Sequence, residues 1–366
     1  MNYFDMQELL DFSTAVLAAA GSTAAEATVV ARHLVEANLT GHDSHGVGMI
    51  PAYVRHVRAG TLQPNAALEQ VQDQGAILTF DGQRGYGQRL AREAIAAAVA
   101  RCRETGLVFM GLRNCHHMGR IGSYGEQCTA AGLVSLHFVN VVDHRPVVAP
   151  FRGTAARYST NPICLAMPAT ANTGAILLDM ATSQTALGKV RVALNKGEQM
   201  AAGTLYDGFG KPTTDPAVMF AEPCGAITPL GAYKGYGIAL FCELLAGVLT
   251  GGGTIQPGNP QLGGIVNHMA SLLIDPQRLV ERQWMQDEID ALVAHLKSSP
   301  AEDPARPVLV AGEPEVLSRR ERMRSGIPVD DTTLAQLLDA GEMAGVSPAQ
   351  AEALRRGSSR SAKPVC

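Results

Sequence analysis

The sequence has helical patterns at both ends and alternating strand and helix patterns in its middle. Apolar residues recur at helical spacing between Leu9 and Leu17, and Thr23-Ala24-Ala25-Glu26 is a capping box for a second helix. Helical spacing returns after Pro314. Two helical regions that are far apart in the sequence can bury their apolar faces against each other. We therefore expect one helical domain from residues 1–72 and 315–366, and one α/β domain from residues 73–314.

The middle of the chain opens with a strand–helix–strand pattern at residues 76–112. Further strands are predicted at residues 134–139, 163–167, 175–178, 271–274 and 308–310. Helices are predicted at residues 122–131, 182–194, 234–249, 281–297, 316–324, 332–342 and 348–356, and residues 357–366 have the polar composition of a frayed tail. The predicted fold class is therefore α/β (α+β).

The amino-acid composition indicates the cellular compartment and excludes some classes of binding partner. Charged residues make up 17% of the 366 residues and the net charge is -4, so there is no basic excess to bind nucleic acid. The seven cysteines are scattered without a Cys-x-x-Cys pair, which is typical of reduced thiols. The most apolar stretch, residues 238–250, contains Glu243 and is shorter than the roughly 20 residues that span a bilayer. We expect a cytoplasmic protein with neither nucleic-acid nor membrane partners.

Two glycine-bounded loops contain four of the ten histidines. His42 and His45 lie in Gly41-His42-Asp43-Ser44-His45-Gly46, and His116 and His117 lie in Asn114-Cys115-His116-His117-Met118-Gly119-Arg120-Ile121-Gly122. Glycine lets a backbone approach a ligand closely, and imidazole exchanges protons near neutral pH. The pattern therefore indicates an enzyme, although histidines that only satisfy hydrogen bonds in loops are the simpler alternative.

A helix start is expected at the segment Asp179-Met180-Ala181-Thr182-Ser183, which lies between a predicted strand and a predicted helix. A helix N-terminus favours a phosphate or a carboxylate. The known nucleotide-binding motifs are missing. Gly82-Gln83-Arg84-Gly85-Tyr86-Gly87 has the spacing G-x-x-G-x-G, with Leu90 in place of the third glycine of the dinucleotide motif, which favours an ordinary turn and helix. Gly231 to Gly237 lacks the Ser or Thr of a phosphate-binding Walker loop.

The histidine loops also raise the question of metal or thiol chemistry. The four loop histidines could in principle surround zinc, but the i,i+4 His pair and the Cys-x-x-Cys spacing of zinc sites are both missing, so no metal ligand is assigned. A metal-dependent hydrolase stays open as an alternative function. Cys115 beside His116 could form a thiolate nucleophile, but packing is the simpler role for it.

Several motifs in a fixed order resemble the malate/L-lactate dehydrogenase family, whose members lack the dinucleotide-binding Rossmann fold. The resemblance covers nearly the whole chain. Within the family the chain resembles the hydroxycarboxylate dehydrogenases, through Ala37-Asn38-Leu39, Gly48-Met49-Ile50-Pro51 and Gly119-Arg120-Ile121-Gly122. The family motifs are Asp43 to Gly46, Asn114 to Gly122, Thr160-Asn161-Pro162, Asp179 to Ser183, Lys234 to Gly237 and Gly312-Glu313.

The resemblance implies an NAD(P)H-dependent reductase of 2-oxo acids, a homodimer with a mixed-sheet cofactor domain at residues 73–314. NADH is the expected cofactor, and NADP stays possible. By position, His117 is the catalytic acid/base, Ser44 and His45 lie beside nicotinamide and substrate, and Tyr53 contacts substrate. The implied cofactor contacts are His45, Gly119, Arg120, Ile121, Asp179, Met180, Thr182, Ser183, Lys234, Asn267, Gly312 and Glu313.

One position departs from the family pattern in a way that affects substrate binding. Many members carry an arginine four residues after the Ser-His histidine, and this chain has Met49 there. Methionine cannot form a bidentate pair with a carboxylate, so another cation must do so, and Arg120 is the first candidate. The departure also keeps open a second activity on the same fold, the reduction of cyclic or N-alkyl imines of 2-oxo acids.

Overall fold

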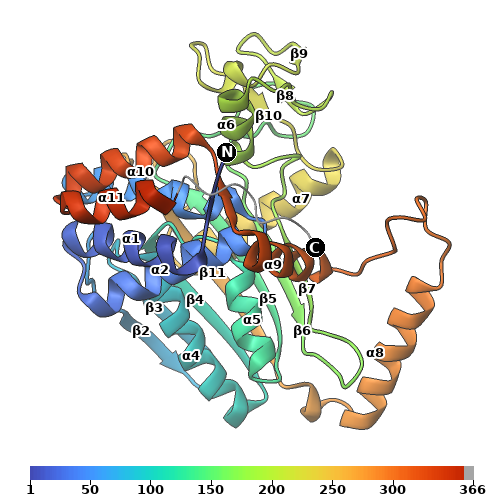
Figure 1. The fold of residues 1–366 in the computed structure, drawn as a ribbon. Helices are drawn as coiled ribbons and strands as arrows, with labels where there is room; N and C mark the ends of the chain where they lie inside the picture. Colours follow the sequence, from blue (N-terminus) through green and yellow to red (C-terminus); the bar gives the residue numbers. More distant parts are fainter. Residues whose placement is uncertain (358–366) are drawn as a thin grey trace.

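A seven-stranded mixed sheet forms the centre of the molecule (Figure 1), which is a computed structural model that describes residues 1–357. The strand order is β2-β3-β4-β11-β5-β6-β7. The strands are β2 (Glu69–Gln74), β3 (Ile77–Asp81), β4 (Leu107–His116), β5 (Val134–Val142), β6 (Ile163–Met167), β7 (Ile176–Met180) and β11 (Val266–Ile274). Only β3 and β4 pair in parallel within this sheet, because a helix connects them, and the other neighbours are antiparallel. This topology confirms the predicted mixed-sheet α/β class.

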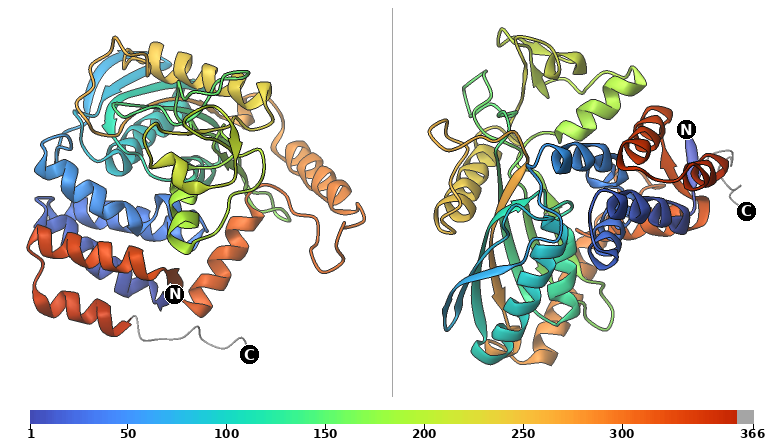
Figure 2. Two further views of the ribbon diagram at one scale, coloured as in Figure 1. Left: turned by 90° about the horizontal axis from the view of Figure 1, so that it is seen from above. Right: turned by 90° about the vertical axis from the view of Figure 1, so that its left-hand side faces the viewer.

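The two faces of the sheet are covered by different helices (Figure 2). On one face lie α4 (Gly87–Thr105) and α5 (Gly122–Ala130), whose apolar residues pack against Val108, Met110 and Leu112 of β4. On the other face lie α7 (Tyr233–Cys242) and the π-helix Glu243–Val248 that continues it. The helix predicted at residues 234–249 is therefore present, but its second half has the wider π geometry.

Helices from both ends of the chain form a separate layer against the sheet domain (Figure 2). The N-terminal ones are α1 (Met6–Ala19), α2 (Ala24–Leu39) and α3 (Ile50–Arg58), and the C-terminal ones are α9 (Glu313–Ser325), α10 (Asp331–Ala344) and α11 (Pro348–Gly357). Strand β1 (Asn2–Phe4) pairs antiparallel with β12 (Ile327–Val329), so the two ends are joined by hydrogen bonds as well as by a shared apolar core. The proposed boundary at residue 72 falls inside β2, which belongs to the sheet.

A third, smaller unit lies at the upper end of the sheet in Figure 1. It contains α6 (Leu187–Lys196) and the short strands β8 (Leu205–Tyr206), β9 (Pro212–Thr213) and β10 (Ala226–Ile227), which the sequence patterns did not predict. Val190 of α6 and Leu205 of β8 are buried in its apolar cluster. Helix α6 extends from this unit to the helical layer. The unit therefore lies over the boundary between the sheet domain and the helical layer (Figure 2).

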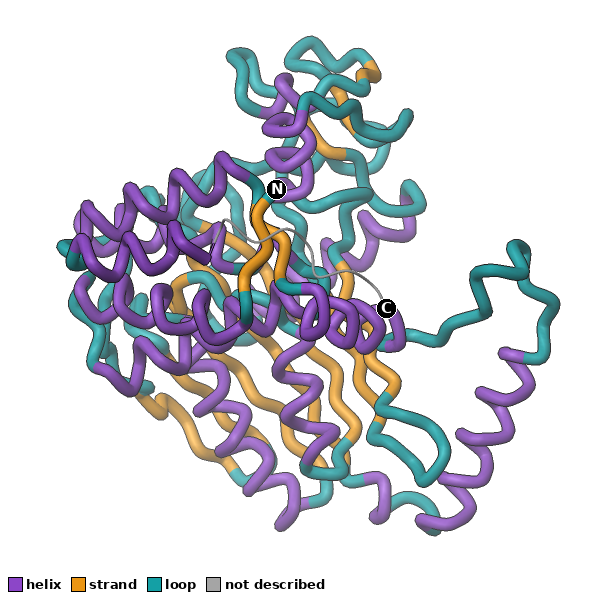
Figure 3. Tube along the Cα trace, in the orientation of Figure 1, coloured by secondary structure: helices purple, strands orange, loops and turns teal. Residues whose placement is uncertain are grey.

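Helix α8 (Arg282–Lys297) lies at the outer edge of the molecule (Figure 3), where its Asp290 accepts hydrogen bonds from Thr170, Asn172 and Thr173 of the loop between β6 and β7. Its side chains are largely exposed, and Val293 is the one that is buried. Within residues 1–357, no helix combines the length and the apolar character needed to cross a membrane.

Two local predictions were wrong, one strand was missed, and one prediction is not tested. The helix expected from residue 182 begins at Leu187, so Thr182 and Ser183 lie in a loop and not at a helix N-terminus. Residues 308–310 are not a strand, and the polar segment Glu69–Gln74 is one. The frayed tail predicted at residues 357–366 lies, beyond Gly357, outside the described residues.

Candidate active site

His116 and His117 lie where strand β4 ends and the chain turns towards α5. The side-chain oxygen of Asn267, on the neighbouring strand β11, accepts the backbone N–H of Met118 at 2.8 Å and holds this turn. A side chain at Gly87 would collide with the His116 carbonyl oxygen, so glycine lets α4 begin directly against the end of β4. The glycines at residues 82–87 thus serve packing at the site, as the turn-and-helix interpretation expected.

The ring of His117 is held by its Nδ1 atom. The Tyr53 hydroxyl lies 2.6 Å from Nδ1, and the Gln88 side-chain nitrogen donates to the Tyr53 oxygen at 2.7 Å. The Tyr53 oxygen has two lone pairs, so it can accept from Gln88 and from the Nδ1–H of His117, and this tautomer leaves the Nε2 lone pair for a ligand. Tyr53 is fully buried, and burial raises the pKa of its hydroxyl, so it stays protonated. Its side chain therefore contacts the expected acid/base.

His45 stacks on His117, with ring centroids 5.4 Å apart and planes inclined by 16°. The loop that carries Ser44 and His45 is fixed by its neighbours, because Asp43 accepts two hydrogen bonds from Arg322 of α9, at 2.6 and 3.0 Å. The predicted residues Ser44, His45, Tyr53 and His117 thus come together from the helical layer and from the end of β4.

Both stacked histidines are neutral near pH 7. Burial, reinforced by the neighbouring His45 charge, holds the pKa of His117 well below its usual value. Burial, with the charges of His42 and Arg120, lowers the pKa of His45 to about 4. A neutral imidazole has a free lone pair, so in the empty site His117 is a base and not an acid.

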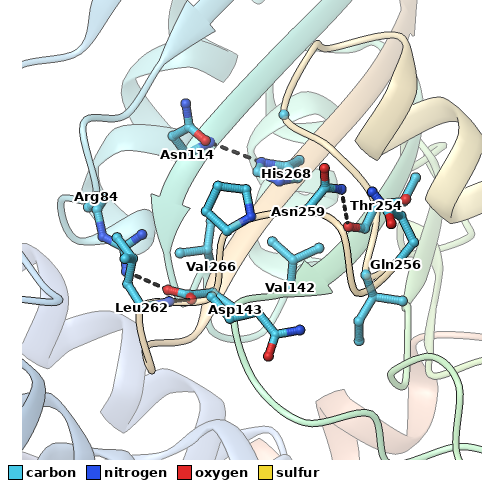
Figure 4. A pocket seen from close by; sticks show the side chains of 14 residues that line it. Arg84, Asn114, Val142, Asp143, Thr254, Gln256, Asn259, Leu262, Val266 and His268 are labelled. Atoms are coloured by element: carbon cyan, nitrogen blue, oxygen red, sulfur yellow. Dashed lines mark hydrogen bonds and ion pairs between the residues drawn. The ribbon is translucent and has the colours of Figure 1, made fainter.

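His116 points away from His117 and pairs with a histidine of α3. Its Nε2 atom lies 2.8 Å from Nδ1 of His56. Beside this pair, a polar cavity of about 160 Å³ is lined by Arg84, Asp143 and His268, and Arg84 reaches Asp143 at 2.5 Å (Figure 4). Neither His117 nor His45 lines this cavity, so the candidate acid/base lies outside it.

The predicted cofactor residues before α5 and at the end of β7 also meet. Asp179 accepts the Gly122 N–H at 2.8 Å and lies 3.5 Å from the Arg120 guanidinium, which reaches Glu126 at 2.7 Å. The backbone N–H of Arg120 donates to Nε2 of His33, on α2, at 3.0 Å. Gly119, Arg120, Ile121 and Asp179 therefore form one compact region, with Met180 next in the chain.

The loop after β7 lies against the start of α7. The Thr182 hydroxyl donates to the Asn161 carbonyl at 2.9 Å, and the Ser183 hydroxyl donates to the Thr185 carbonyl at 2.7 Å. Gly235 approaches the Thr182 carbonyl so closely that a side chain at 235 would collide with it, which brings the preceding Lys234 to this loop. Thr182, Ser183 and Lys234 are thus grouped without a helix N-terminus at 182.

Gly312 and Glu313 come to β7 from the start of α9. The Ala311 carbonyl accepts the Leu177 N–H at 3.1 Å, and Gly312 has a φ of 95° that favours glycine. Glu313 forms an ion pair with Lys297 and accepts the Val310 N–H at 2.9 Å. These residues reach the same strand as Asp179.

The residues of this region fit a polar anionic ligand. Arg120 is 2% exposed, yet its Nε and Nη2 atoms make no hydrogen bond within the described chain. The same holds for Oδ1 of Asn161 and Nδ1 of His45. Buried polar atoms normally have partners, so donors and acceptors left free around Asp179 and His45 suit the polar groups of a dinucleotide.

Residues 1–357 contain neither a grouping of side chains for a metal ion nor a reactive thiol at Cys115. No three His, Cys, Asp or Glu side chains in that range are grouped so that they could hold a metal ion. Cys115 is buried, and burial raises the pKa of its thiol, which keeps it protonated and unreactive.

Three contributors to the site were not predicted from the sequence. Gln88 supports Tyr53, His33 holds the Arg120 backbone, and His56 pairs with His116. Gln88 directly follows the Gly82–Gly87 turn, but nothing in the spacing indicates its partner. His33 and His56 lie within helices whose apolar periodicity gave no reason to single them out.

Comparison with known proteins establishes the family. The family model described as malate/L-lactate dehydrogenase matches residues 4–338. The chain belongs to the malate/L-lactate dehydrogenase family. Hydroxycarboxylate dehydrogenase B of Escherichia coli (strain K12) is 44% identical over 345 residues, or 94% of each chain. The predicted family resemblance is thereby confirmed, and with it an oxidoreductase that acts on hydroxy acids.

Two solved structures share the fold. A protein of Escherichia coli assigned as a malate/lactate dehydrogenase has a TM-score of 0.93 and 41% identity. The match covers 98% of this chain and 100% of that protein. The Δ1-piperideine-2-carboxylate reductase of Pseudomonas syringae pvar. tomato has a TM-score of 0.80 and 26% identity, with coverage of 93% and 100%. The fold is thus shared with a protein named as a Δ1-piperideine-2-carboxylate reductase.

Proposed function

We propose that the protein is an NAD(P)H-dependent oxidoreductase that interconverts 2-oxo acids and 2-hydroxy acids, with His117 as the acid/base and NADH as the preferred cofactor. The observation that carries the proposal is the Tyr53–His117 hydrogen bond, which occupies Nδ1 and leaves Nε2 for the substrate oxygen. Family membership supports the hydroxy-acid chemistry.

His117 moves the proton in this mechanism. In oxidation, its neutral Nε2 removes the hydroxyl proton of the 2-hydroxy acid, and in reduction the protonated ring returns that proton to the carbonyl oxygen. An anionic substrate raises the pKa of a nearby histidine, so carboxylate binding favours the protonated form that reduction needs. Ser44 and His45 lie where they can orient the substrate against the His117 ring.

The cofactor would be held by Arg120, Asp179, Thr182 and Gly312, together with the remaining predicted contacts around them. When bound, nicotinamide exchanges a hydride with C2 of the substrate. Members of this dehydrogenase family generally use nicotinamide cofactors. The preference for NADH stays a proposal.

The test is reduced-nicotinamide oxidation by metal-free protein with a panel of 2-oxo acids, using NADH and NADPH in parallel. Turnover with NADH and an oxo acid alone is expected. His117→Ala should lower kcat by roughly 100-fold to 10,000-fold, the usual range for a lost acid/base, while NADH binding is retained. An unchanged kcat would remove His117 from the mechanism, and no turnover with either cofactor would overturn the function.

Imine reduction is the second candidate, and the Pseudomonas syringae reductase is the observation that favours it. It differs in the atom that receives the proton, which is nitrogen instead of oxygen. Addition of methylamine to the same assay separates the two, because only an imine reductase gains turnover from the amine. Membership of the malate/L-lactate dehydrogenase family gives no support for a metal-dependent hydrolase.

We also propose that the protein is a cytoplasmic homodimer. The six cysteines within the described residues are all free thiols, as expected in a reducing compartment. The exposed apolar face of α8 is the surface on which a second copy is expected.

A further inference from the structure

The substrate carboxylate needs a cation that residue 49 does not supply. Met49 is half-buried one turn before Tyr53 on the same side of α3, so its side chain lies near the site but carries no charge. Arg120 is a poor replacement, because its guanidinium is enclosed and already faces the carboxylates of Glu126 and Asp179. The cation for the substrate carboxylate must therefore come from another element that lies close to Met49.

Helix α6 reaches it. A Cβ at Gly188 would lie 2.5 Å from Cβ of Ser44, so the first turn of α6 packs directly on the loop that carries Ser44 and His45. One turn later, the Arg191 guanidinium lies against the backbone just before Met49, with its Nη2 atom 3.8 Å from the position that a Cβ would have at Gly48.

The charge of Arg191 is uncompensated. Within residues 1–357, its side chain forms neither an ion pair nor a hydrogen bond. Burial lowers the pKa of this half-buried guanidinium, and the neighbouring charge of Arg55 lowers it further, while Asp330 opposes them. Asp330 acts on Arg191 without an ion pair between them, and its two oxygens accept the N–H and hydroxyl of Thr333 at the start of α10.

A half-buried arginine without an anion is costly, and a bound carboxylate would relieve that cost. Met49, Ala52 and His56 are spaced i, i+3 and i+7 and are all half-buried, so they lie on one side of α3 together with the start that Gly48 precedes. Gly48, which Arg191 contacts, directly precedes it.

We propose that Arg191 binds the carboxylate of the 2-oxo acid, the task that an arginine at position 49 performs in many members of the family. The inference rests on the proposed function. The planar guanidinium can pair with both carboxylate oxygens, whereas Lys189, on the same helix, offers a single exposed ammonium group.

The test compares Arg191→Met with the unaltered protein on a 2-oxo acid and on the primary amide of the same acid. Loss of a charged pair should raise KM for the acid by roughly 10-fold to 150-fold, and leave kcat/KM for the neutral amide within about threefold. Lys196→Met, at the far end of α6, is the matched control and should change neither value. NADH binding, followed by fluorescence, should be unaffected.

Two further variants complete the design. Arg191→Lys should recover part of the preference for the acid, and Met49→Arg in the Arg191→Met background should restore it. If Arg191→Met does not fold, the lysine variant alone decides, because it must still show a weaker preference for the acid.

An unchanged KM in the Arg191 variants overturns the assignment, as does a loss that appears in Lys189→Met or Arg55→Met instead. Failure of the proposed function is distinct, because then the unaltered protein would turn over no 2-oxo acid with either cofactor.

Discussion

His117 depends on two side chains that a sequence motif does not link to it. Tyr53 comes from the helical layer and Gln88 from the start of α4, and together they fix which ring nitrogen faces the substrate. The histidine itself was predictable, since it lies in a glycine-bounded loop with a family pattern. Its support was not, because contacts between residues 35 and 64 positions apart follow from tertiary packing.

Removal of the Tyr53 hydroxyl tests this support. Tyr53→Phe leaves Nδ1 of His117 and the amide of Gln88 without a partner, so kcat should fall by about 10-fold to 100-fold while NADH affinity is retained. The Tyr53 oxygen, as acceptor of Nδ1–H, favours the protonated ring, so its loss should lower the pKa of His117 further. Tyr86→Phe, whose ring lies 5.8 Å from that of Tyr53, is the control.

The pH profile carries the sign of this effect. The base in oxidation must be unprotonated, so kcat/KM for the hydroxy acid should fall only when pH drops through a His117 pKa that lies below 6.5. In Tyr53→Phe this acid limb should move to lower pH. A reduced kcat with an unmoved limb would mean that Tyr53 has only a packing role.

At the scale of elements, the π-helix Glu243–Val248 connects the sheet to the loop after β7. The buried carboxylate of Glu243 accepts hydrogen bonds from Asn140 of β5 at 3.1 Å, from Asn161 at 2.8 Å and from the Ile255 N–H at 3.1 Å. Asn161 in turn accepts the Thr182 hydroxyl through its carbonyl. This chain of contacts explains why a charged residue interrupts the most apolar stretch of the sequence.

Glu243→Gln should destabilise the fold, since an amide puts a donor where three donors already converge. The expected loss is about 1–3 kcal/mol in the free energy of unfolding, the cost of leaving a buried polar group unsatisfied. Denaturant unfolding of this variant and of Glu302→Gln, an exposed control, measures the difference. Equal stability of the two would show that Glu243 is not the anchor of this region.

Elements with clear periodicity were predictable from the sequence, and elements that depend on their surroundings were not. The terminal helices and strands β3 to β6 follow from apolar spacing. Strand β2 is polar and exposed throughout its length at the sheet edge, so no alternation marks it. The start of α6 was misplaced because the loop at residues 182–186 is shaped by Asn161 and α7, which local propensity does not include.

At the scale of the whole molecule, the exposed apolar side chains of α8 indicate a protein–protein interface. Trp284, Leu292 and Leu296 are 57%, 54% and 48% exposed on this helix at the outer edge of the protein (Figure 1). Phe241 and Val248, on α7 and the π-helix, are 59% and 54% exposed. Monomeric proteins rarely leave such faces in water, so we expect a second copy to cover them.

Light scattering during size-exclusion chromatography should therefore give twice the mass of the chain. Leu292→Glu places a charge in the apolar face of α8 and should shift the protein to monomer, whereas Ala294→Glu, on the opposite side of the same helix, should not. If the unaltered protein is a monomer, or if both variants remain dimeric, then α8 is not the interface. Activity of the monomeric variant then tells whether each site is complete within one chain, as the contacts around His117 imply.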